Sequence, residues 1–419
     1  MPAGNALIAE KMPVPVDAGT PGEPPRAPAP SLVVPQPAPI SIECATGARL
    51  TEIEADWLDL VRRAHEPNVF MDPAVVEVAQ RSFHDDCGVT LLAWQGAGKS
   101  KTLVGLWAFS VTHPDYLPLP RRILLAPAAP HSYLATPVID RDMADSALEA
   151  MLDFIARSDL PKLVALNQIR LDGPTMRALD RVLNARGTAP FVLAKDRRPV
   201  LASGLSAAKY FEKALSGSTR KKLRQHRRRL QEKGNLESKV WTAPDAVCRA
   251  FDDFLHLEAA GWKGRRGTAM HCKAAEAAFA RNLVAKLACR GAASIHALYF
   301  DGRPISMQVV LRAGSVAFTW KTAYAETAHE YSPGMLLLED YTRAFLADDT
   351  ITMVDSCAYD ERGFMSAWSE RQEIGQVWLN PASGFSLRFF LLGHLQKVAL
   401  WLRSVVKETY LWGRQWKKN

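Results

Sequence analysis

The stretch SIHALYFDGRPISMQVVLRAGSVAFTWKT, residues 294–322, decides the fold because it contains three strand-like runs and two turn signals. Asp301-Gly302 is a strong hairpin signal, since both residue types tolerate the backbone conformation that a tight turn requires. Arg312-Ala313-Gly314 separates the second run from a third. The stretch therefore predicts strands over 294–300, 305–311 and 315–322, with the first two paired as a hairpin.

A hairpin of similar character is expected earlier in the chain. Two strand-like runs, 89–94 and 102–109, are joined by the turn-rich residues 95–101. Apolar residues at helical spacing precede and follow both hairpins, for example in 52–64 and 334–346. Two such hairpins, each surrounded by helices, predict a duplicated α+β module.

The first hairpin contains AWQGAGKS, residues 93–100, which fits a relaxed phosphate-loop pattern. A phosphate loop needs a helix after it, so that backbone N–H groups and the helix N-terminus face the phosphate. The residues that follow are TLVGLWAF, which favour a strand. We interpret the segment as a hairpin tip and expect no ATPase site.

The composition divides the chain into four parts. Residues 1–40 hold eleven of the 27 prolines and predict a disordered leader. The N-terminal module is expected over 41–205 and the C-terminal module over 206–384, which includes a basic helix at 216–233. Residues 385–419 predict a basic amphipathic helix.

The net charge of +8, from 52 Lys and Arg against 44 Asp and Glu, is concentrated in two segments. Residues 216–234 carry eight cationic side chains and one Glu, and residues 385–419 carry seven and one. The remainder of the chain is net acidic. Patches of this kind favour anionic partners, which we expect to be a cofactor, an acceptor, nucleic acid or lipid.

Six scattered cysteines, with no Cys-x-x-Cys spacing and no clustered Cys and His, argue against structural zinc and against disulfides. The first residues lack the pattern of a secretory signal, and polar residues interrupt the longest apolar run, 385–402. These observations predict a cytoplasmic protein with no transmembrane segment and no metal site.

Four segments in a fixed order resemble a known family. They are STRKKLR at 218–224, EAAGWKG at 258–264, KTAY at 321–324 with YSPG at 331–334, and VDSCA at 354–358 before Trp368. Over about 60–380 the chain resembles the CelD/BcsL-type acetyltransferases of the GNAT superfamily, whose two-module architecture is shared with the Fem aminoacyl-transferases. The resemblance implies an α+β fold of tandem GNAT-like modules, each a mixed, mostly antiparallel sheet flanked by helices, and the use of acetyl-CoA or another acyl-CoA.

The start of the helix after Ser332-Pro333-Gly334 is the predicted cofactor site. Serine suits an N-cap, proline suits the first helical turn, and glycine allows a ligand close to the backbone. Unpaired N–H groups and the helix dipole then attract an anion. The resemblance assigns the pyrophosphate of acetyl-CoA to Tyr331, Ser332, Gly334, Met335 and Leu336. An ordinary capped helix with no ligand is the alternative.

The candidate catalytic residues are Lys321, Tyr324 and Asp355. Lys321 ends a strand, where its cation can hold a phosphate or polarise a thioester carbonyl, or lie on the surface. Family members often have Tyr-Asp where this chain has Tyr324-Ala325. Asp355 also ends a strand and can act as a general base or cap the next turn. His296 is a candidate base, with a core histidine as the stronger alternative.

The candidate substrate-binding residues are Arg220 and Arg224 on the basic helix and Trp262 and Lys263 in a glycine-rich loop. The helix can clamp an anionic acceptor, contact tRNA as in the Fem relatives, or present only a solvated face. The tail can dock Phe389, Leu392, Leu395 and Leu402 on the second module, or contact a membrane as a peripheral helix.

Together these observations predict an acyltransferase that moves an acyl group, most simply acetyl, from CoA to an amine or hydroxyl. Backbone N–H groups near 319–322 are expected to stabilise the oxyanion. The acceptor is a small molecule or saccharide, which the family links to cellulose or exopolysaccharide biosynthesis. The alternatives are an aminoacyl-tRNA-dependent ligase and a non-catalytic scaffold associated with a membrane or a synthase.

Overall fold

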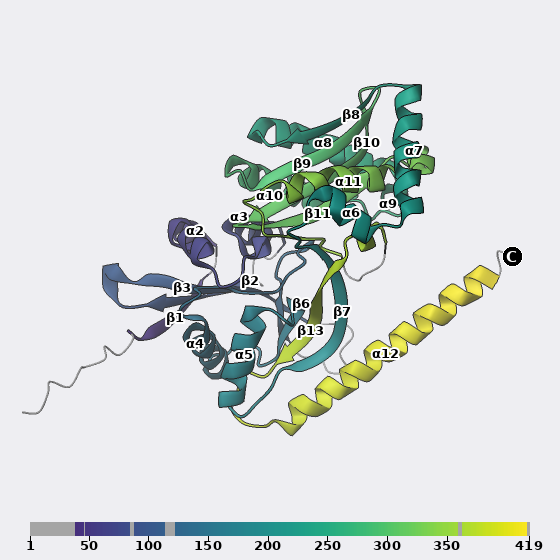
Figure 1. Cartoon of the computed structure of the whole chain (residues 1–419). Helices are drawn as coiled ribbons and strands as arrows, with labels where there is room; N and C mark the ends of the chain where they lie inside the picture. Colours follow the sequence, from purple (N-terminus) through teal and green to yellow (C-terminus); the bar gives the residue numbers. More distant parts are fainter. Residues whose placement is uncertain (1–37, 46, 84–87, 114–121, 359–362, 417–419) are drawn as a thin grey trace, which may run out of the picture. The chain divides into compact units, whose positions relative to one another are not determined.

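The computed structural model describes residues 38–45, 47–83, 88–113, 122–358 and 363–416. Helices and strands alternate in a mixed α+β arrangement (Figure 1), which confirms the predicted fold class. The predicted disordered leader lies almost wholly outside the described residues. The strand Ile40–Ala45 begins the described secondary structure, at the end of the segment predicted to be irregular.

The N-terminal half contains β1 to β7 and α1 to α5. Its strands are β1 Ile40–Ala45, β2 Gly88–Gln95, β3 Thr102–Thr112, β4 Ile123–Ala126, β5 Val138–Ile139, β6 Val164–Arg170 and β7 Phe191–Leu201. Its helices are α1 Ala48–Glu52, α2 Glu54–Arg63, α3 Pro73–Phe83, α4 Ala144–Arg157 and α5 Pro174–Ala185. The strands β2 and β3 form the predicted hairpin, and 95–101 forms its tip.

The C-terminal half contains β8 to β13 and α6 to α12. Its strands are β8 Leu236–Trp241, β9 Ala293–Phe300, β10 Arg303–Ala313, β11 Val316–Tyr324, β12 Met353–Asp355 and β13 Glu370–Leu379. Its helices are α6 Ala207–Ala214, α7 Gly217–Lys233, α8 Pro244–Ala260, α9 Trp262–Arg265, α10 Ala274–Cys289, α11 Pro333–Leu346 and α12 Leu387–Trp416. The three strands predicted over 294–322 are β9, β10 and β11.

The strands form one sheet whose order is β1-β2-β3-β4-β6-β13-β7-β12-β11-β10-β9-β8, with β5 paired to β3. Both halves repeat one pattern. Two antiparallel pairings, β2 with β3 and β3 with β4, are followed by a parallel pairing of β4 with β6. The pairings of β9, β10, β11 and β12 have the same directions in the same order. The sheet is therefore built from two copies of one topology.

The last strand of each half pairs with the other half. β13 lies between β6 and β7, and β7 pairs with β12 through Leu201 and Val200 (Figure 1). β13, from within 206–384, thus pairs with strands of 41–205, and β7, from within 41–205, pairs with β12 of the C-terminal half. This exchange brings the end of β7 to the middle of the sheet, where it contributes to the candidate site.

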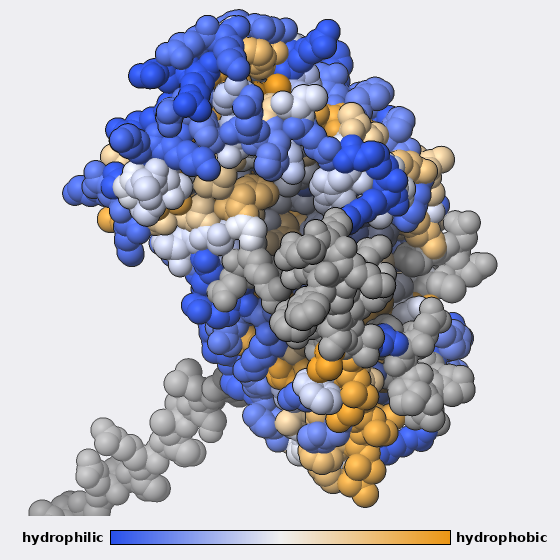
Figure 2. All heavy atoms as spheres, turned by 90° about the vertical axis from the view of Figure 1, so that its right-hand side faces the viewer, coloured by the Kyte–Doolittle hydropathy of each residue, from blue (hydrophilic) through white to orange (hydrophobic). Residues whose placement is uncertain are grey.

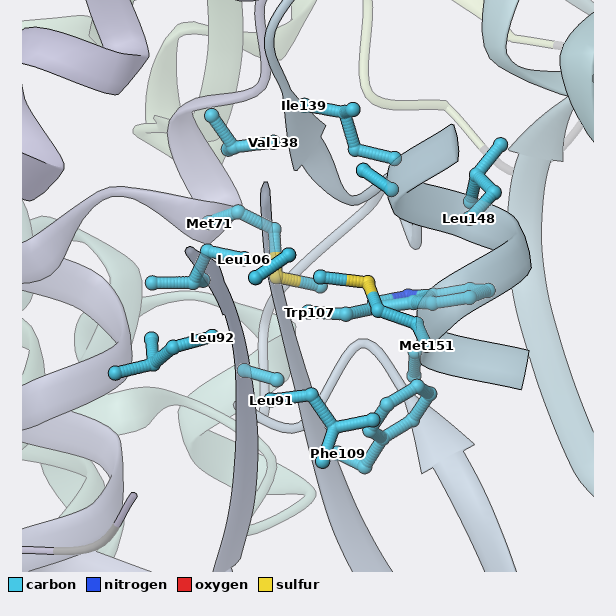
Figure 3. Close-up of a cluster of buried hydrophobic side chains, with 14 of the residues drawn as sticks. Met71, Leu91, Leu92, Leu106, Trp107, Phe109, Val138, Ile139, Leu148 and Met151 are labelled. Atoms are coloured by element: carbon cyan, nitrogen blue, oxygen red, sulfur yellow. The ribbon is translucent and has the colours of Figure 1, made fainter. Parts of the chain in front are cut away.

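The two halves also share a core. In the N-terminal half, Trp107, Phe109, Leu148 and Met151 pack between the sheet and α4 (Figure 3). A second cluster joins apolar residues of α3 to α8, α10 and strands β9 to β11. Burial of this apolar area is the main term that stabilises the contact between the halves. Lys286 on α10 donates to Glu77 on α3 across the same contact (2.5 Å).

The tail docks through Phe389 and Leu392 as predicted, although on a strand from each half, and the prediction is wrong for Leu395 and Leu402. Phe389, Leu392 and Leu400 of α12 pack with Phe191 and Trp378, which belong to the central strands β7 and β13. Leu395 and Leu402, which were also expected to dock, are 56% and 51% exposed. These two leucines lie on the opposite face of the helix. The side chains of Trp412 and Trp416, near the end of this helix, lie outside the described residues.

Candidate functional site

The first turn of α11 follows the end of β11 through a short 3-10 helix, Glu326–Tyr331. Ser332 has a left-handed backbone (φ 50°), and its carbonyl accepts from the N–H groups of Met335 (2.9 Å) and Leu336 (3.2 Å). Its hydroxyl makes no capping hydrogen bond, so the serine occupies the N-cap position but caps through its backbone. Pro333 is the first residue of the helix, as its fixed φ favours.

Gly334 faces open space at this helix start. A Cβ added to it would meet no heavy atom within 4 Å, although most of α11 around Leu336 and Leu337 is buried. Pro333 has no N–H, and among the described residues no acceptor is paired with the N–H of Gly334. The helix start therefore offers a free donor, the positive end of the helix dipole and the room that a phosphate group needs.

The basic helix α7 packs beside this helix start. Lys233 donates to the Tyr331 hydroxyl (2.5 Å), and the Tyr331 ring also contacts His226 edge to face. Arg227 pairs with Asp340 on α11 (2.6 Å). The structure thus brings Tyr331, Ser332, Gly334, Met335 and Leu336 together with the helix that carries Arg220 and Arg224.

The cations of α7 divide into two sets. Leu223, His226 and Leu230 form its buried face, and Arg227 is tied to α11. Arg224 is exposed, as are Lys221, Lys222, Arg228 and Arg229, and Arg220 lies 4.0 Å from Glu212. The outward cations form an electropositive surface next to the α11 start, whereas Arg227 holds the two helices together.

A pocket of about 200 Å³ lies at the end of β11. Trp262 and Lys263 from α9 and Tyr324 from β11 all line it, together with Leu257, Glu258, Gly261, Thr322, Ala323 and Phe364. Lys263 pairs with Glu258 (2.8 Å) and donates to the Thr322 carbonyl (3.3 Å). Three predicted site residues from two distant segments therefore share one pocket.

Lys321 lies next to this pocket, and its ammonium group contacts two residues of the N-terminal half. Nζ donates to the hydroxyl of Tyr133 (2.8 Å) and lies 3.1 Å from His131 Nδ1. Burial, reinforced by the nearby Lys263, lowers the pKa of Lys321 from 10.5 to about 8. A lysine in this state exchanges its proton near neutral pH.

His131 is held in turn by Glu276 of α10, with 3.0 Å between Nε2 and Oε2. Burial, and then the charge of Lys321, lower the pKa of His131, which keeps the ring neutral. A carboxylate only accepts, so the proton lies on Nε2 and Nδ1 accepts from Lys321. Glu276 thereby orients His131, and His131 orients Lys321.

Asp355 lies in a closed network. Its carboxylate is 2% exposed and accepts from Arg198 of β7 (3.2 Å), Gln372 of β13 (2.5 Å) and the Cys357 N–H (2.7 Å). The Cys357 bond is the turn-capping contact that was the alternative for this residue. Asp355 does not line the pocket.

His296 lies away from these groups, against the rings of Tyr341 and Phe345. Burial lowers its pKa to about 4, so the ring is neutral. This placement agrees with the core-histidine interpretation. Among the described residues, no cluster of three or more His, Cys, Asp or Glu side chains has the arrangement of a metal site.

Sequence reasoning missed the residues that the N-terminal half contributes. His131 and Tyr133 lie in the segment APAAPHSYLATP, 126–137, which has no helical or strand periodicity. Arg198 lies in DRRP, 196–199, which resembles a charged turn. A His and a Tyr within a loop that consists mostly of Ala and Pro were the available signal.

Comparisons with known protein families and solved structures agree with the strand order and with the geometry of this site. Residues 217–363 match the family model described as an acetyltransferase (GNAT) domain. This half of the chain has a GNAT acyltransferase fold. The match includes every predicted site residue and excludes His131 and Tyr133.

Solved structures extend the likeness to most of the chain. FemX is 11% identical, with a TM-score of 0.53, over 80% of this chain and 96% of its own. A second similar structure is the C-terminal DUF2156 domain of an Agrobacterium fabrum protein assigned as a lysylphosphatidylglycerol synthetase. It is 13% identical, with a TM-score of 0.51, over 84% of this chain and 97% of its own. At these identities the likeness concerns the fold. No curated protein sequence matches the chain.

Proposed function

We propose that the protein is an acyltransferase that moves an acyl group, most simply acetyl, from CoA to an amine or hydroxyl. The observation that carries the proposal is the start of α11, where Gly334 has open space and an unpaired N–H within the GNAT-like half. A cytoplasmic location belongs to the proposal, because the scattered thiols suit a reducing compartment.

Three parts of the chain would hold the cofactor. The Gly334 N–H and the dipole of α11 would bind the pyrophosphate, and the outward cations of α7, among them Arg224, would add long-range attraction. β11 continues to Tyr324 after its last pairing with β12 at Phe318, so this edge of 319–322 has no neighbouring strand among the described residues. An unpaired strand edge has N–H groups that can stabilise an oxyanion.

Lys321 is our candidate for the proton transfer. A CoA thioester would supply the carbonyl carbon that an acceptor amine or hydroxyl attacks, and its C–S bond would break as the new bond forms, so that CoA leaves as a thiolate. Neutral Lys321 would take the proton that the acceptor loses, and His131 and Glu276 would hold Nζ in position. Asp355, whose carboxylate accepts hydrogen bonds from Arg198 and Gln372, would position β12 beside this site.

The pocket at Trp262, Lys263 and Tyr324 is the proposed acceptor site. An indole 42% exposed at its rim can stack on a sugar ring, and the Lys263 and Glu258 pair can bind hydroxyl or amino groups. A saccharide acceptor agrees with the CelD/BcsL-type resemblance and with a role in cellulose or exopolysaccharide biosynthesis.

The test is calorimetric titration of acetyl-CoA into the full chain and into two variants. Gly334→Trp fills the open space, and we expect it to abolish measurable binding while circular dichroism and thermal unfolding stay unchanged. Gly334→Ala adds a Cβ that meets nothing, and we expect it to bind as the parent does. Equal affinity in all three proteins would contradict the site.

A second candidate function is an aminoacyl-tRNA-dependent ligase, which the exposed cations of α7 favour. Its signature is tRNA binding whose log K falls with log salt and that Arg224→Ala weakens. The same calorimetric titration with tRNA in place of acetyl-CoA separates the two, since Gly334→Trp should leave a contact made by α7 intact.

A further inference from the structure

The exposed apolar residues of the molecule are concentrated on α12 and the residues just before it. Among the described residues, eleven large hydrophobic side chains are exposed, and nine of them lie within 385–405. They are Phe385, Leu387, Phe390, Leu391, Leu395, Val398, Trp401, Leu402 and Val405. Figure 2 shows apolar residues gathered at the lower end of the view. A contiguous surface of this kind marks a contact with an apolar partner.

The opposite face of α12 is already occupied. Phe389 packs edge to face on Phe191, and Leu392 and Leu400 belong to the same cluster. A Cβ on Gly393 would come within 2.8 Å of the Phe191 ring, so the helix backbone lies directly against β7. The exposed apolar face therefore points away from the sheet, on a helix whose other face is fixed.

Two cations border the outward face. At about 100° per residue, Leu387, Leu391, Leu395, Val398 and Leu402 form one stripe about 22 Å long. Arg388 falls about 60° to one side of its centre and Lys397 about 120° to the other, and both are exposed. An apolar stripe between cationic flanks is the arrangement of a helix that lies in the surface of a membrane.

We propose that this outward face of α12 binds an anionic membrane surface, with the helix parallel to the bilayer. Residues 385–419 carry seven Lys and Arg and a single Glu, which complements anionic headgroups rather than a second copy of the same basic helix. Within the part of the chain that is described, no helix is long and apolar enough to cross a bilayer. The contact is therefore peripheral, and it is independent of the acyl-transfer proposal.

Cosedimentation of the full chain with vesicles tests this contact. We expect the protein to pellet with phosphatidylcholine vesicles that contain phosphatidylglycerol, and less with phosphatidylcholine alone. Leu395→Glu places a charge at the centre of the stripe and should lower the partition coefficient at least about tenfold, because a leucine loses its burial. Lys397→Gln should lower it less and reduce its salt dependence.

Val240→Glu is the matched control, because Val240 is a similarly exposed (51%) apolar residue on β8 and receives the same charge. It should pellet as the parent does, and thermal unfolding should show that all variants are folded. The proposal fails if the parent does not pellet or if Leu395→Glu pellets equally well. It also fails if sedimentation velocity shows a dimer that Leu395→Glu dissociates, which would assign the face to a second copy.

Discussion

Two clusters of polar groups lie between the halves of the molecule, and they differ in how their charges are paired. Around Asp355, an arginine, an amide and a backbone N–H satisfy one carboxylate, and Arg198 finds further acceptors in the carbonyls of Tyr133 and Ala358. Around Lys321, the ammonium hydrogen-bonds to two neutral groups, the Tyr133 hydroxyl and His131.

Tyr133 belongs to both clusters, because its carbonyl accepts from Arg198 and its hydroxyl accepts from Lys321. The two clusters therefore use a buried charge differently, one to hold strands together and the other to present a proton. The Arg198 and Asp355 pair joins a cation to a carboxylate and holds the exchanged strand β7 beside β12. Lys321 is held without a carboxylate in contact, which makes its proton labile.

The largest expected effect is on stability, at the first cluster. Arg198→Met leaves the Asp355 carboxylate buried without its cation, and we expect the free energy of unfolding to fall by about 3–5 kcal/mol. Urea unfolding measures it. Lys195→Met, at an exposed position on the same strand, should change the free energy by less than about 0.5 kcal/mol.

Adding Asp355→Asn to Arg198→Met removes the stranded charge and should recover part of the loss. If Arg198→Met lowers the free energy of unfolding no more than Lys195→Met does, the pair does not hold the two halves together, and the contrast between the clusters disappears.

At the second cluster, around Lys321, we expect removal of the cation to raise the free energy of unfolding instead of lowering it. The pKa of Lys321 is lowered from 10.5 to about 8, so between these values the unfolded chain binds the extra proton and stability rises with pH. Below about pH 8 the cost of the buried ammonium is fully present, at about 3 kcal/mol. Lys321→Met should therefore be more stable than the parent at pH 7, by up to about that amount.

Urea unfolding at several pH values checks this sign. The gap between Lys321→Met and the parent should narrow as pH rises from about 8 toward about 10, while proton transfer by the variant is lost at every pH. A variant less stable than the parent at pH 7 would show that Lys321 is a structural cation like Arg198.

The first cluster could not be predicted from the sequence, and the reason is the strand exchange. Local patterns predicted β9, β10, β11 and α11, since a hairpin signal such as Asp301-Gly302 and a helix start such as Ser332-Pro333-Gly334 act over a few residues. β7 and β13 are also strand-like, but nothing within them specifies that each pairs with the other half. Arg198 therefore looked like part of a solvated turn.

The sequence predicted the parts of the site that lie within single segments of the chain. Lys321 and Tyr324 lie in the last four residues of β11, and Trp262 and Lys263 begin α9, so all four belong to elements of the same half. His131 is 190 residues from Lys321 in the chain and has no local pattern of its own. Its role depends on packing between halves, which the sequence does not encode locally.

The smallest expected effect tests whether the chain from Glu276 through His131 reaches Lys321. The Glu276 carboxylate attracts the Lys321 ammonium, so Glu276→Gln should lower the pKa of Lys321 further below about 8. Lys263 and Glu258 also act on this ammonium and remain unchanged in the variant. NMR of lysine labelled at the Cε position follows the titration directly, with Lys321→Met assigning the signal.

Lys273→Met is the control for this titration, because Lys273 pairs with Glu276 from solvent and is 61% exposed. Its charge is screened, so its removal should leave the Lys321 titration unchanged. If Glu276→Gln and Lys273→Met titrate alike, Glu276 acts only at the surface of α10, and Lys321 would be tuned by burial and Lys263 alone. A shift confined to Glu276→Gln would make the second cluster a linked proton site assembled from both halves.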